Sequence, residues 1–269
     1  MLARSRCLNA NRPHKRLHST SPHNIATDLH SRVRILLRDT AQPVAVITSY
    51  MPSSSNSSTD SPTHPFHGAT LSSFASISMS PHPLVAFSLR VPSRMATTLS
   101  LLSSGDLTQF QHTNPERILP ETHFVANILS ASQPRTALLF SRPDLHPRPF
   151  DDVQWSSTAE GLPIVHDSLG AMSCRIVAGP WPLHDLDALG GRDEKQGEAE
   201  RATELEVGAG EVSSELFIAR VMRVEDVPLT EAKANEAIRD DALRTLPLLY
   251  HRRRYASTQD LETQPSSGF

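Results

Sequence analysis

The stretch Gly68-Ala69-Thr70-Leu71-Ser72-Ser73-Phe74-Ala75-Ser76-Ile77-Ser78 alternates two kinds of side chain. This alternation predicts a β-strand. In an extended chain, one face carries the hydroxyl groups of Thr70, Ser72, Ser76 and Ser78. A row of hydroxyls makes a poor hydrophobic core but suits a ligand rich in oxygen, such as a ribityl chain with its phosphate. A strand that faces solvent explains the same pattern, and this stretch alone leaves both interpretations open.

Further short strands are expected on both sides of this stretch. Residues 43–48 form an apolar, β-branched run, and residues 84–90 follow two prolines that end strand pairing. Other strand patterns cover residues 123–130, 171–178 and 215–225, with a strand and loop over 155–165. Short strands outnumber helices, so the sequence predicts a mainly β fold. A barrel of mixed or antiparallel strands is favoured over a doubly wound sheet.

Three helices are expected, and one of them has a chemical consequence. Residues 28–39 form an amphipathic pattern capped by Thr27 or Asp28, and residues 133–140 form a second helix. Ser93 is a typical N-cap for the third helix and places Arg94 in its first turn. Unpaired N–H groups and the helix dipole favour an anion there, and arginine adds a planar set of donors. A phosphorylated cofactor is therefore the leading ligand.

Composition divides the chain into a core and several segments that cannot form one. The domain is expected over residues 28–256, with Ser, Thr and Pro dominating an insert near 51–67. A second insert near 182–214 is acidic, and we interpret it as a solvated segment because its carboxylates lack the pattern of a calcium-binding loop. Residues 257–269 are expected to form a flexible tail.

Residues 1–27 lack acidic side chains and carry basic ones spread among leucine and serine. This composition is typical of a mitochondrial presequence, because import depends on positive charge along an amphipathic segment. The expected location is the mitochondrial matrix. A disordered basic tail remains the alternative interpretation.

Composition and motifs exclude several classes of function. The 269 residues hold 26 Lys and Arg against 29 Asp and Glu, so the net charge of −3 provides no overall positive field for nucleic acid. No apolar run is long enough to span a membrane. The two cysteines have no partner at metal-ligand spacing, so no metal site is expected, and Cys174 is expected to pack as an apolar residue. Phosphate-loop, dinucleotide-fold, zinc-protease and serine-hydrolase motifs are absent.

Most of the 13 histidines lie in the basic N-terminus or in proline-rich segments. His64 and His67 belong to such a segment. We therefore expect both side chains to be exposed to solvent.

The ordered set of motifs resembles the flavin reductase-like, FMN-binding split-barrel family. The resemblance rests first on residues 43–48, on residues 68–85 and on Ser93-Arg94. Later blocks agree in the same order, at residues 124–130, 161–163, 171–174, 217–221 and 247–250. The similarity covers roughly residues 38–255, apart from the inserts.

The resemblance implies a split β-barrel that forms a homodimer and binds FMN without a covalent bond. Carried over by position, the residues that contact the cofactor are Thr70, Ser72, Ser73, Ser76, Ser93, Arg94 and Asn127. NADH or NADPH then supplies a hydride to the flavin, and the reduced flavin passes electrons to a partner protein or to oxygen.

Four positions depart from the family pattern. Many members carry an Asp-His pair before the late strand, where this chain has Ser213 and Ser214, and the glycine within that strand is Ala219. Met95 replaces a hydroxyl residue in the phosphate turn. The departures at Ser213, Ser214 and Ala219 make nicotinamide turnover less secure than flavin binding. Met95 instead removes one donor to the phosphate, a loss that Arg94 can offset.

Three functions therefore remain open from the sequence. The first is an NAD(P)H-dependent flavin reductase. The second is an FMN-binding redox, storage or partner protein without nicotinamide turnover. The third is an assembly factor that retains the barrel without a cofactor.

Overall fold

The computed structural model describes residues 22–52, 65–105, 121–185, 189, 213–230 and 242–258. The chain divides into two compact units, Met1–Thr40 and Ala41–Phe269. Most of both predicted inserts, the predicted C-terminal tail and residues 1–21 lie outside the described residues.

Helix α1 (Pro22–Arg38) belongs to the first unit. It begins six residues before the predicted start at Asp28, so the predicted cap at Thr27 or Asp28 is wrong. Proline is favoured at the first position of a helix, and this preference outweighed the local capping signal. The large apolar side chains of α1 that the structure describes are exposed, namely Leu29, Val33, Ile35, Leu36 and Leu37.

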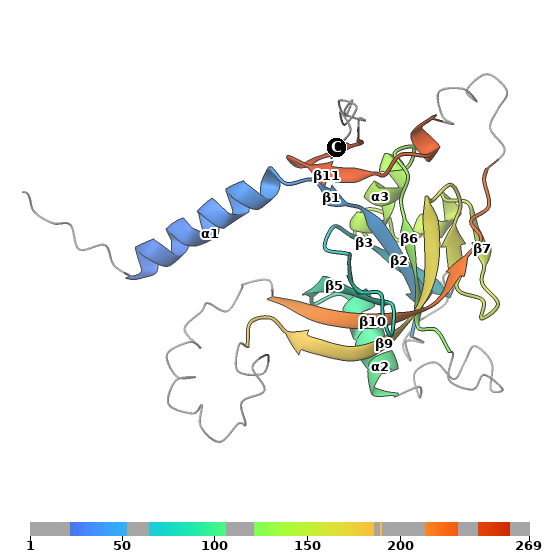
Figure 1. Ribbon diagram of the computed structural model, residues 1–269, viewed down its shortest axis with the longest axis horizontal. Helices are drawn as coiled ribbons and strands as arrows, with labels where there is room; N and C mark the ends of the chain where they lie inside the picture. Colours follow the sequence, from blue (N-terminus) through green and yellow to red (C-terminus); the bar gives the residue numbers. More distant parts are fainter. Residues whose placement is uncertain are drawn as a thin grey trace, which may run out of the picture. The chain divides into compact units, whose positions relative to one another are not determined.

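A seven-stranded antiparallel sheet dominates the second unit (Figure 1). Its strands, in spatial order, are β3 (Phe66–Leu71), β2 (Ala45–Tyr50), β6 (Phe124–Ile128), β9 (Gly170–Pro182), β10 (Ser213–Glu225), β5 (Leu84–Val91) and β4 (Ala75–Ser78). The sheet curls so that β3 at one edge approaches β5 near the other. This arrangement confirms the predicted mainly β split-barrel class.

The hydroxyl-rich stretch is not one strand. It forms β3 and β4, which lie at opposite edges of the sheet, and residues 72–74 connect them. Ser73 determines this break, because its hydroxyl donates to the carbonyl oxygen of Ser88 (3.2 Å) and accepts from the N–H of Ser88 (3.0 Å). The side chain thus satisfies backbone groups of β5 just beyond the end of its pairing with β4.

Two helices cover the sheet where the sequence predicts them. Helix α2 (Arg94–Ser104) begins at the Ser93 cap, whose oxygen accepts from the N–H of Ala96 at 3.1 Å. It ends at Gly105, which adopts a left-handed conformation. Helix α3 (Pro134–Ser141) has its proline in the first turn, as expected.

Smaller elements complete the second unit. The predicted strand and loop over 155–165 is a hairpin of β7 (Trp155–Ser157) and β8 (Pro163–Val165). A 3-10 turn, η2 (Pro149–Asp151), precedes it. Near the C-terminus, β11 (Leu249–His251) and β12 (Arg254–Ala256) form a hairpin that pairs with β1 (Gln42–Pro43).

Two apolar clusters cover opposite faces of β2. The larger lies between the sheet and α2 and contains the fully buried rings of Phe87, Phe124 and Phe217. The smaller lies against α3 and includes Phe140. Gly68 makes this second contact possible, because a Cβ there would lie 2.5 Å from the Phe140 ring. Any side chain at position 68 would therefore force α3 away from β3.

The strands extend further than the predicted insert boundaries allow. Phe66 and His67 belong to β3, and Pro182, Ser213 and Ser214 belong to β9 and β10. Pairing with neighbouring strands orders these residues, a contribution that local composition does not report. Within the described residues, no helix is long and apolar enough to cross a membrane, and no cluster of side chains has the makings of a metal site.

Candidate functional site

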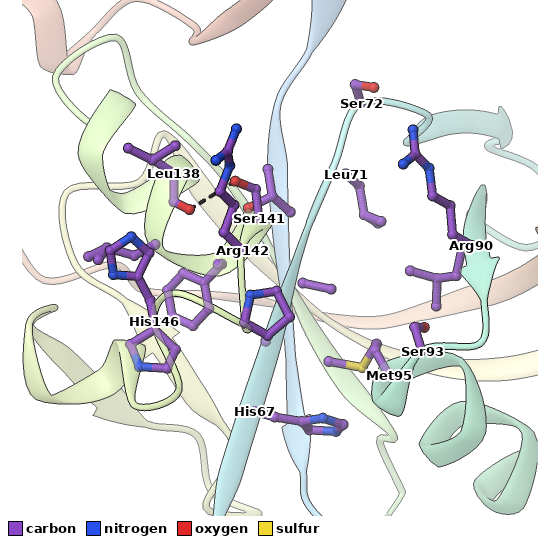
Figure 2. A pocket seen from close by; sticks show the side chains of 18 of the residues that line it. His67, Leu71, Ser72, Arg90, Ser93, Met95, Leu138, Ser141, Arg142 and His146 are labelled. Atoms are coloured by element: carbon purple, nitrogen blue, oxygen red, sulfur yellow. Dashed lines mark hydrogen bonds between the residues drawn. The ribbon is translucent and has the colours of Figure 1, made fainter. Parts of the chain in front are cut away.

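A cavity of about 980 Å³ opens between α3, the edge strand β3 and the start of α2. In Figure 2, Leu138, Ser141, Arg142 and His146 lie on one side of β3, and Arg90, Ser93 and Met95 lie on the other. The volume is at the upper end of the range of about 300–1,000 Å³ that is typical of ligand sites. The cavity is therefore large enough for a nucleotide-sized molecule.

Arg90, Ser93 and Arg94 form one side of the cavity, which we call the α2 wall. Ser93 caps the helix through Ala96, so its hydroxyl oxygen is already engaged. The N–H groups of Arg94 and Met95 precede the first helical hydrogen bond and have no partner within α2. These N–H groups and two guanidinium groups suit an anion, as the sequence predicts.

Strand β3 and the turn after it form the floor. The Thr70 hydroxyl donates to the Ala137 carbonyl oxygen at 2.7 Å and thereby joins β3 to α3. Ser73 is engaged with Ser88, as described above. Ser72 also lines the cavity. Three of the predicted hydroxyls on this stretch, those of Thr70, Ser72 and Ser73, therefore line the cavity, and two of them also hold its walls in place.

His67 is one of the cavity residues that the sequence analysis missed. Its side chain is only 7% exposed and lines the cavity, so the prediction of solvent exposure is wrong. Pairing of His67 with Ser49 in the sheet, rather than the composition of the preceding segment, decides its position. Burial, reinforced by the positive charge of Arg94, lowers the pKa of His67 to about 4 despite a hydrogen bond to the Tyr50 backbone. The imidazole is therefore neutral at pH 7.

The Nε2 atom of His67 is buried and has no hydrogen-bond partner. An unpaired buried polar atom is costly unless a ligand or water completes it. Because the other ring nitrogen is the one left to contact the Tyr50 backbone, Nε2 is the atom available to a molecule in the cavity. This is an independent sign that the cavity receives a polar ligand.

Two predicted contact residues do not line the cavity. Ser76 lies on β4, exposed, and its hydroxyl contacts the sulfur of Met79. Asn127 is fully buried in β6, where its side-chain amide donates to the Val46 carbonyl oxygen and accepts from the N–H of Val165. The structure assigns Asn127 to the join between the main sheet and the β7–β8 hairpin.

Two of the positions that depart from the family pattern, Ser214 and Met95, line the cavity. Ser214 lines it, opposite Arg90 in the pairing of β10 with β5. Met95 also lines the cavity, but its side chain is buried in the larger apolar cluster. Cys174 is fully buried, and burial raises the pKa of its thiol to about 12, in agreement with the predicted apolar role.

The charged side chains of the cavity carry positive charge. Among the described residues, its lining includes five arginines, Arg90, Arg94, Arg142, Arg253 and Arg254, and no aspartate or glutamate. None of these arginines forms an ion pair within the part of the chain that the structure describes. An anionic ligand would offset their mutual repulsion. The donor set and the unpaired Nε2 atom therefore fit a phosphorylated flavin, with phosphate on cationic donors and polar atoms near His67.

Residues 37–259 match the model of the flavin reductase like domain. The chain belongs to this family. The matched range includes every strand of the sheet and all the residues that line the cavity.

Individual proteins of similar sequence or structure are also found. A curated relative, the NADH-dependent FMN reductase SmoA of Agrobacterium fabrum, is 32% identical over 111 residues, which is 41% of this chain and about half (51%) of the relative. Among solved structures, nitrilotriacetate monooxygenase component B from Mycobacterium thermoresistibile aligns with TM-score 0.52 and 20% identity, over 91% of this chain and 94% of that one. A flavin reductase domain protein from Arthrobacter sp. FB24 aligns with TM-score 0.52 and 17% identity, over 87% and 99%. At these identities the two structures show a shared fold.

Acid should destabilise the domain through two neutral histidines. His123 accepts a hydrogen bond from the N–H of Ile176 at Nδ1, and burial, with the charge of Arg175, lowers its pKa to about 4, like that of His67. Between pH 6.5 and 4 these two imidazoles bind protons in the unfolded chain but not in the folded chain. The free energy of unfolding therefore falls as pH falls. Each histidine should contribute a loss of about 3 kcal/mol over that window. Urea unfolding at pH 7, 6 and 5 measures the slope.

The variant His67→Gln separates the two contributions. It should reduce the slope of unfolding free energy against pH by about half. His82→Gln, which replaces an exposed histidine on the β4–β5 turn, should leave the slope as in the wild type. Equal slopes in the wild type and His67→Gln would show that His67 is not held neutral by the fold.

Proposed function

We propose that this protein is an FMN-binding flavin reductase that takes hydride from NADH or NADPH. The carrying observation is a cavity at the start of a capped helix, in a flavin reductase-like domain, whose described lining residues include five arginines and no carboxylate. The similarity to an NADH-dependent FMN reductase supports NADH as the hydride donor and FMN as the flavin. An electron-accepting partner protein or oxygen completes the cycle.

In this proposal the residues of the chain bind and orient the two molecules. Arg94 and the first N–H groups of α2 hold the flavin phosphate, and Ser72 contacts the ribityl chain. His67 is neutral, so its Nε2 atom accepts a hydrogen bond from a ligand N–H or O–H group. The flavin itself supplies the hydride chemistry when bound. The apolar side chains of Leu71 and Leu138 shield part of the cavity from water.

A second function is favoured by one observation. Ser214 lines the cavity where family members carry a histidine, and a serine does not exchange protons near pH 7 as a histidine does. The alternative is therefore a flavin-binding protein that stores flavin or serves a redox partner without nicotinamide turnover. A cofactor-free assembly factor is disfavoured by the cavity arginines, for which the salt bridges among the described residues supply no carboxylate partner.

Anaerobic spectra test the proposal directly. The purified protein, reconstituted with FMN, should lose its flavin absorbance within seconds of adding NADH or NADPH. Slow or absent bleaching with both nucleotides, in a protein that retains flavin, would favour the storage or partner function. A protein that binds no FMN in a titration would contradict both.

Matched variants locate the flavin phosphate. Arg94→Gln should weaken FMN binding by about ten- to a hundredfold, because one charge-assisted hydrogen bond contributes about 1.5–3 kcal/mol. Ser93→Ala combined with Arg94→Ala should lose bound FMN with the fold retained. Arg135→Gln is the control, because it removes a charge from an exposed residue of α3 paired with Asp152, outside the cavity. Unchanged flavin affinity in Arg94→Gln would show that the phosphate lies elsewhere.

We further propose that the protein is a homodimer. Strand alternation places Ile77, Val177, Met222 and Val224 on the outer face of the β4, β5, β10 and β9 part of the sheet, and all four are exposed. Apolar residues gathered on one outer face of a sheet are typical of a surface that a second protein covers.

Light scattering should therefore report twice the mass of the 29.6 kDa chain. Met222→Lys combined with Val224→Lys should shift the protein to monomer, because burying two charges opposes association. A wild-type monomer at micromolar concentration would contradict the proposal.

The location is proposed to be the mitochondrial matrix. The basic N-terminal composition and the amphipathic pattern of α1 from Asp28 onward support it. N-terminal sequencing of the protein recovered from mitochondria should give a start beyond Arg16. Recovery only from the cytosol, with Met1 retained, would contradict the proposal.

A further inference from the structure

The cavity has more positive charge than one flavin phosphate uses. Arg90 and Arg94 stand on the α2 wall, where the flavin phosphate is proposed to bind. Arg142, Arg253 and Arg254 line the opposite side, which we call the hairpin wall. Figure 2 shows Arg142 and Arg90 on opposite sides of β3. A single phosphate on the α2 wall leaves the hairpin wall without a counter-charge.

The hairpin wall is assembled from two distant parts of the chain. Arg142 follows the last residue of α3, and Arg253 and Arg254 lie at the tip of the β11–β12 hairpin. A hydrogen bond between the side chains of Ser141 and Tyr255 joins the two parts, each one residue from an arginine of the wall. Tyr255 packs against the smaller apolar cluster, so the hairpin is anchored rather than loose.

The turn of this hairpin has a backbone that arginine does not favour. The two residues between β11 and β12 are Arg252 and Arg253, with φ of 50° and 64°. A two-residue turn with both φ values positive normally carries Asn-Gly or a similar pair. A residue with a Cβ in the left-handed region costs about 1–2 kcal/mol. Arginine at such a position indicates that its side chain has a function, because the backbone conformation of the turn does not favour it.

Arg142 alone would not carry this inference. It lies at the C-terminal end of α3, where the helix dipole favours a cation in any case. Arg253 and Arg254 have no such explanation, and neither has an ion-pair partner among the described residues. Tyr250 lines the same wall, and its ring contacts Tyr255 edge to face with centroids 5.8 Å apart. The wall thus offers guanidinium groups beside a fixed aromatic face.

We propose that the hairpin wall is a second phosphate subsite, which binds the adenosine phosphate part of a dinucleotide while the α2 wall holds the flavin phosphate. Guanidinium groups match phosphate oxygens, and the Tyr250 ring offers a surface on which adenine stacks. Two sources share this chemistry, namely the nicotinamide dinucleotide and the adenosine half of FAD. The inference rests on the proposed function for the identity of the first ligand, but the subsite itself is tested without flavin.

The key variant is Arg253→Gly. Glycine adopts the turn conformation without strain, so the midpoint of thermal unfolding should stay level or rise. ADP, titrated calorimetrically into the flavin-free protein at low salt, should bind the variant roughly tenfold more weakly than the wild type. Arg254→Gln should weaken ADP to a similar extent, whereas Arg135→Gln, the control outside the cavity, should not.

Further titrations identify the source of the phosphate. With FMN bound, a roughly tenfold loss of NADP⁺ or NAD⁺ affinity in Arg253→Gly assigns the wall to the nicotinamide dinucleotide. A loss of FAD affinity with FMN affinity unchanged assigns it to the adenosine half of FAD. If Arg253→Gly weakens FMN binding as much as ADP binding, both ligands place their phosphate at the same site. That result would overturn the second subsite.

Equal ADP affinity in the wild type, Arg253→Gly and Arg254→Gln would also overturn it. Failure of the wild type to bind FMN would contradict the proposed function alone, because ADP binding to the hairpin wall is measured separately.

Discussion

Ser73 satisfies two backbone groups of Ser88 with one hydroxyl, and the shape of the barrel depends on this interaction. The chain leaves β3 at one edge of the sheet and enters β4 at the other after residues 72–74. A crossing this short requires the two edges to be close together, so the sheet curls. Unpaired N–H and C=O groups on β5 would otherwise be left where β4 stops. Strand β3 and this crossing together form the floor of the cavity.

The contact between β3 and α3 sets the width of the cavity. Gly68 lets the Phe140 ring approach the strand, and the hydroxyl of Thr70 holds the Ala137 carbonyl group. These two contacts fix α3, and with it Arg142 and Ser141, beside β3. Ser141 in turn holds Tyr255 of the C-terminal hairpin. Packing around one glycine therefore positions the hairpin wall, whose Arg253 and Arg254 lie more than 180 residues away in the sequence.

A chain with net charge −3 has five arginines around one cavity, and none of them forms an ion pair with another described residue. Solvent access reduces the cost of their repulsion without removing it. His67 responds to the same field, because the charge of Arg94 adds to burial in keeping its imidazole neutral. The cavity therefore presents cations on its walls and a neutral hydrogen-bonding group on its floor, an arrangement that separates the phosphate of a ligand from its polar ring or sugar atoms.

Local signals in the sequence determined the helices and most strands. Ser93 caps α2 because capping depends on residues within one turn, and Arg94 follows it at the cavity for the same reason. Asn127 was misplaced because its amide bonds to Val46 and Val165, which are distant in the sequence. The composition of the segment before His67 predicts an exposed side chain, but pairing with Ser49 in the sheet buries it. The hairpin turn at Arg252 and Arg253 gave no signal, because arginine is unusual at such positions.

The amino-acid order by itself was enough for the class of fold, the family and the α2 wall, since each rests on short-range periodicity, capping or an ordered set of motifs. Only the tertiary structure decided that the hydroxyl-rich stretch divides between opposite edges of the sheet, that a histidine lies on the cavity floor, and that the C-terminal hairpin supplies arginines to the same cavity. These features depend on pairing and packing between residues far apart in the chain. A short segment of sequence does not show which distant residues will make such contacts.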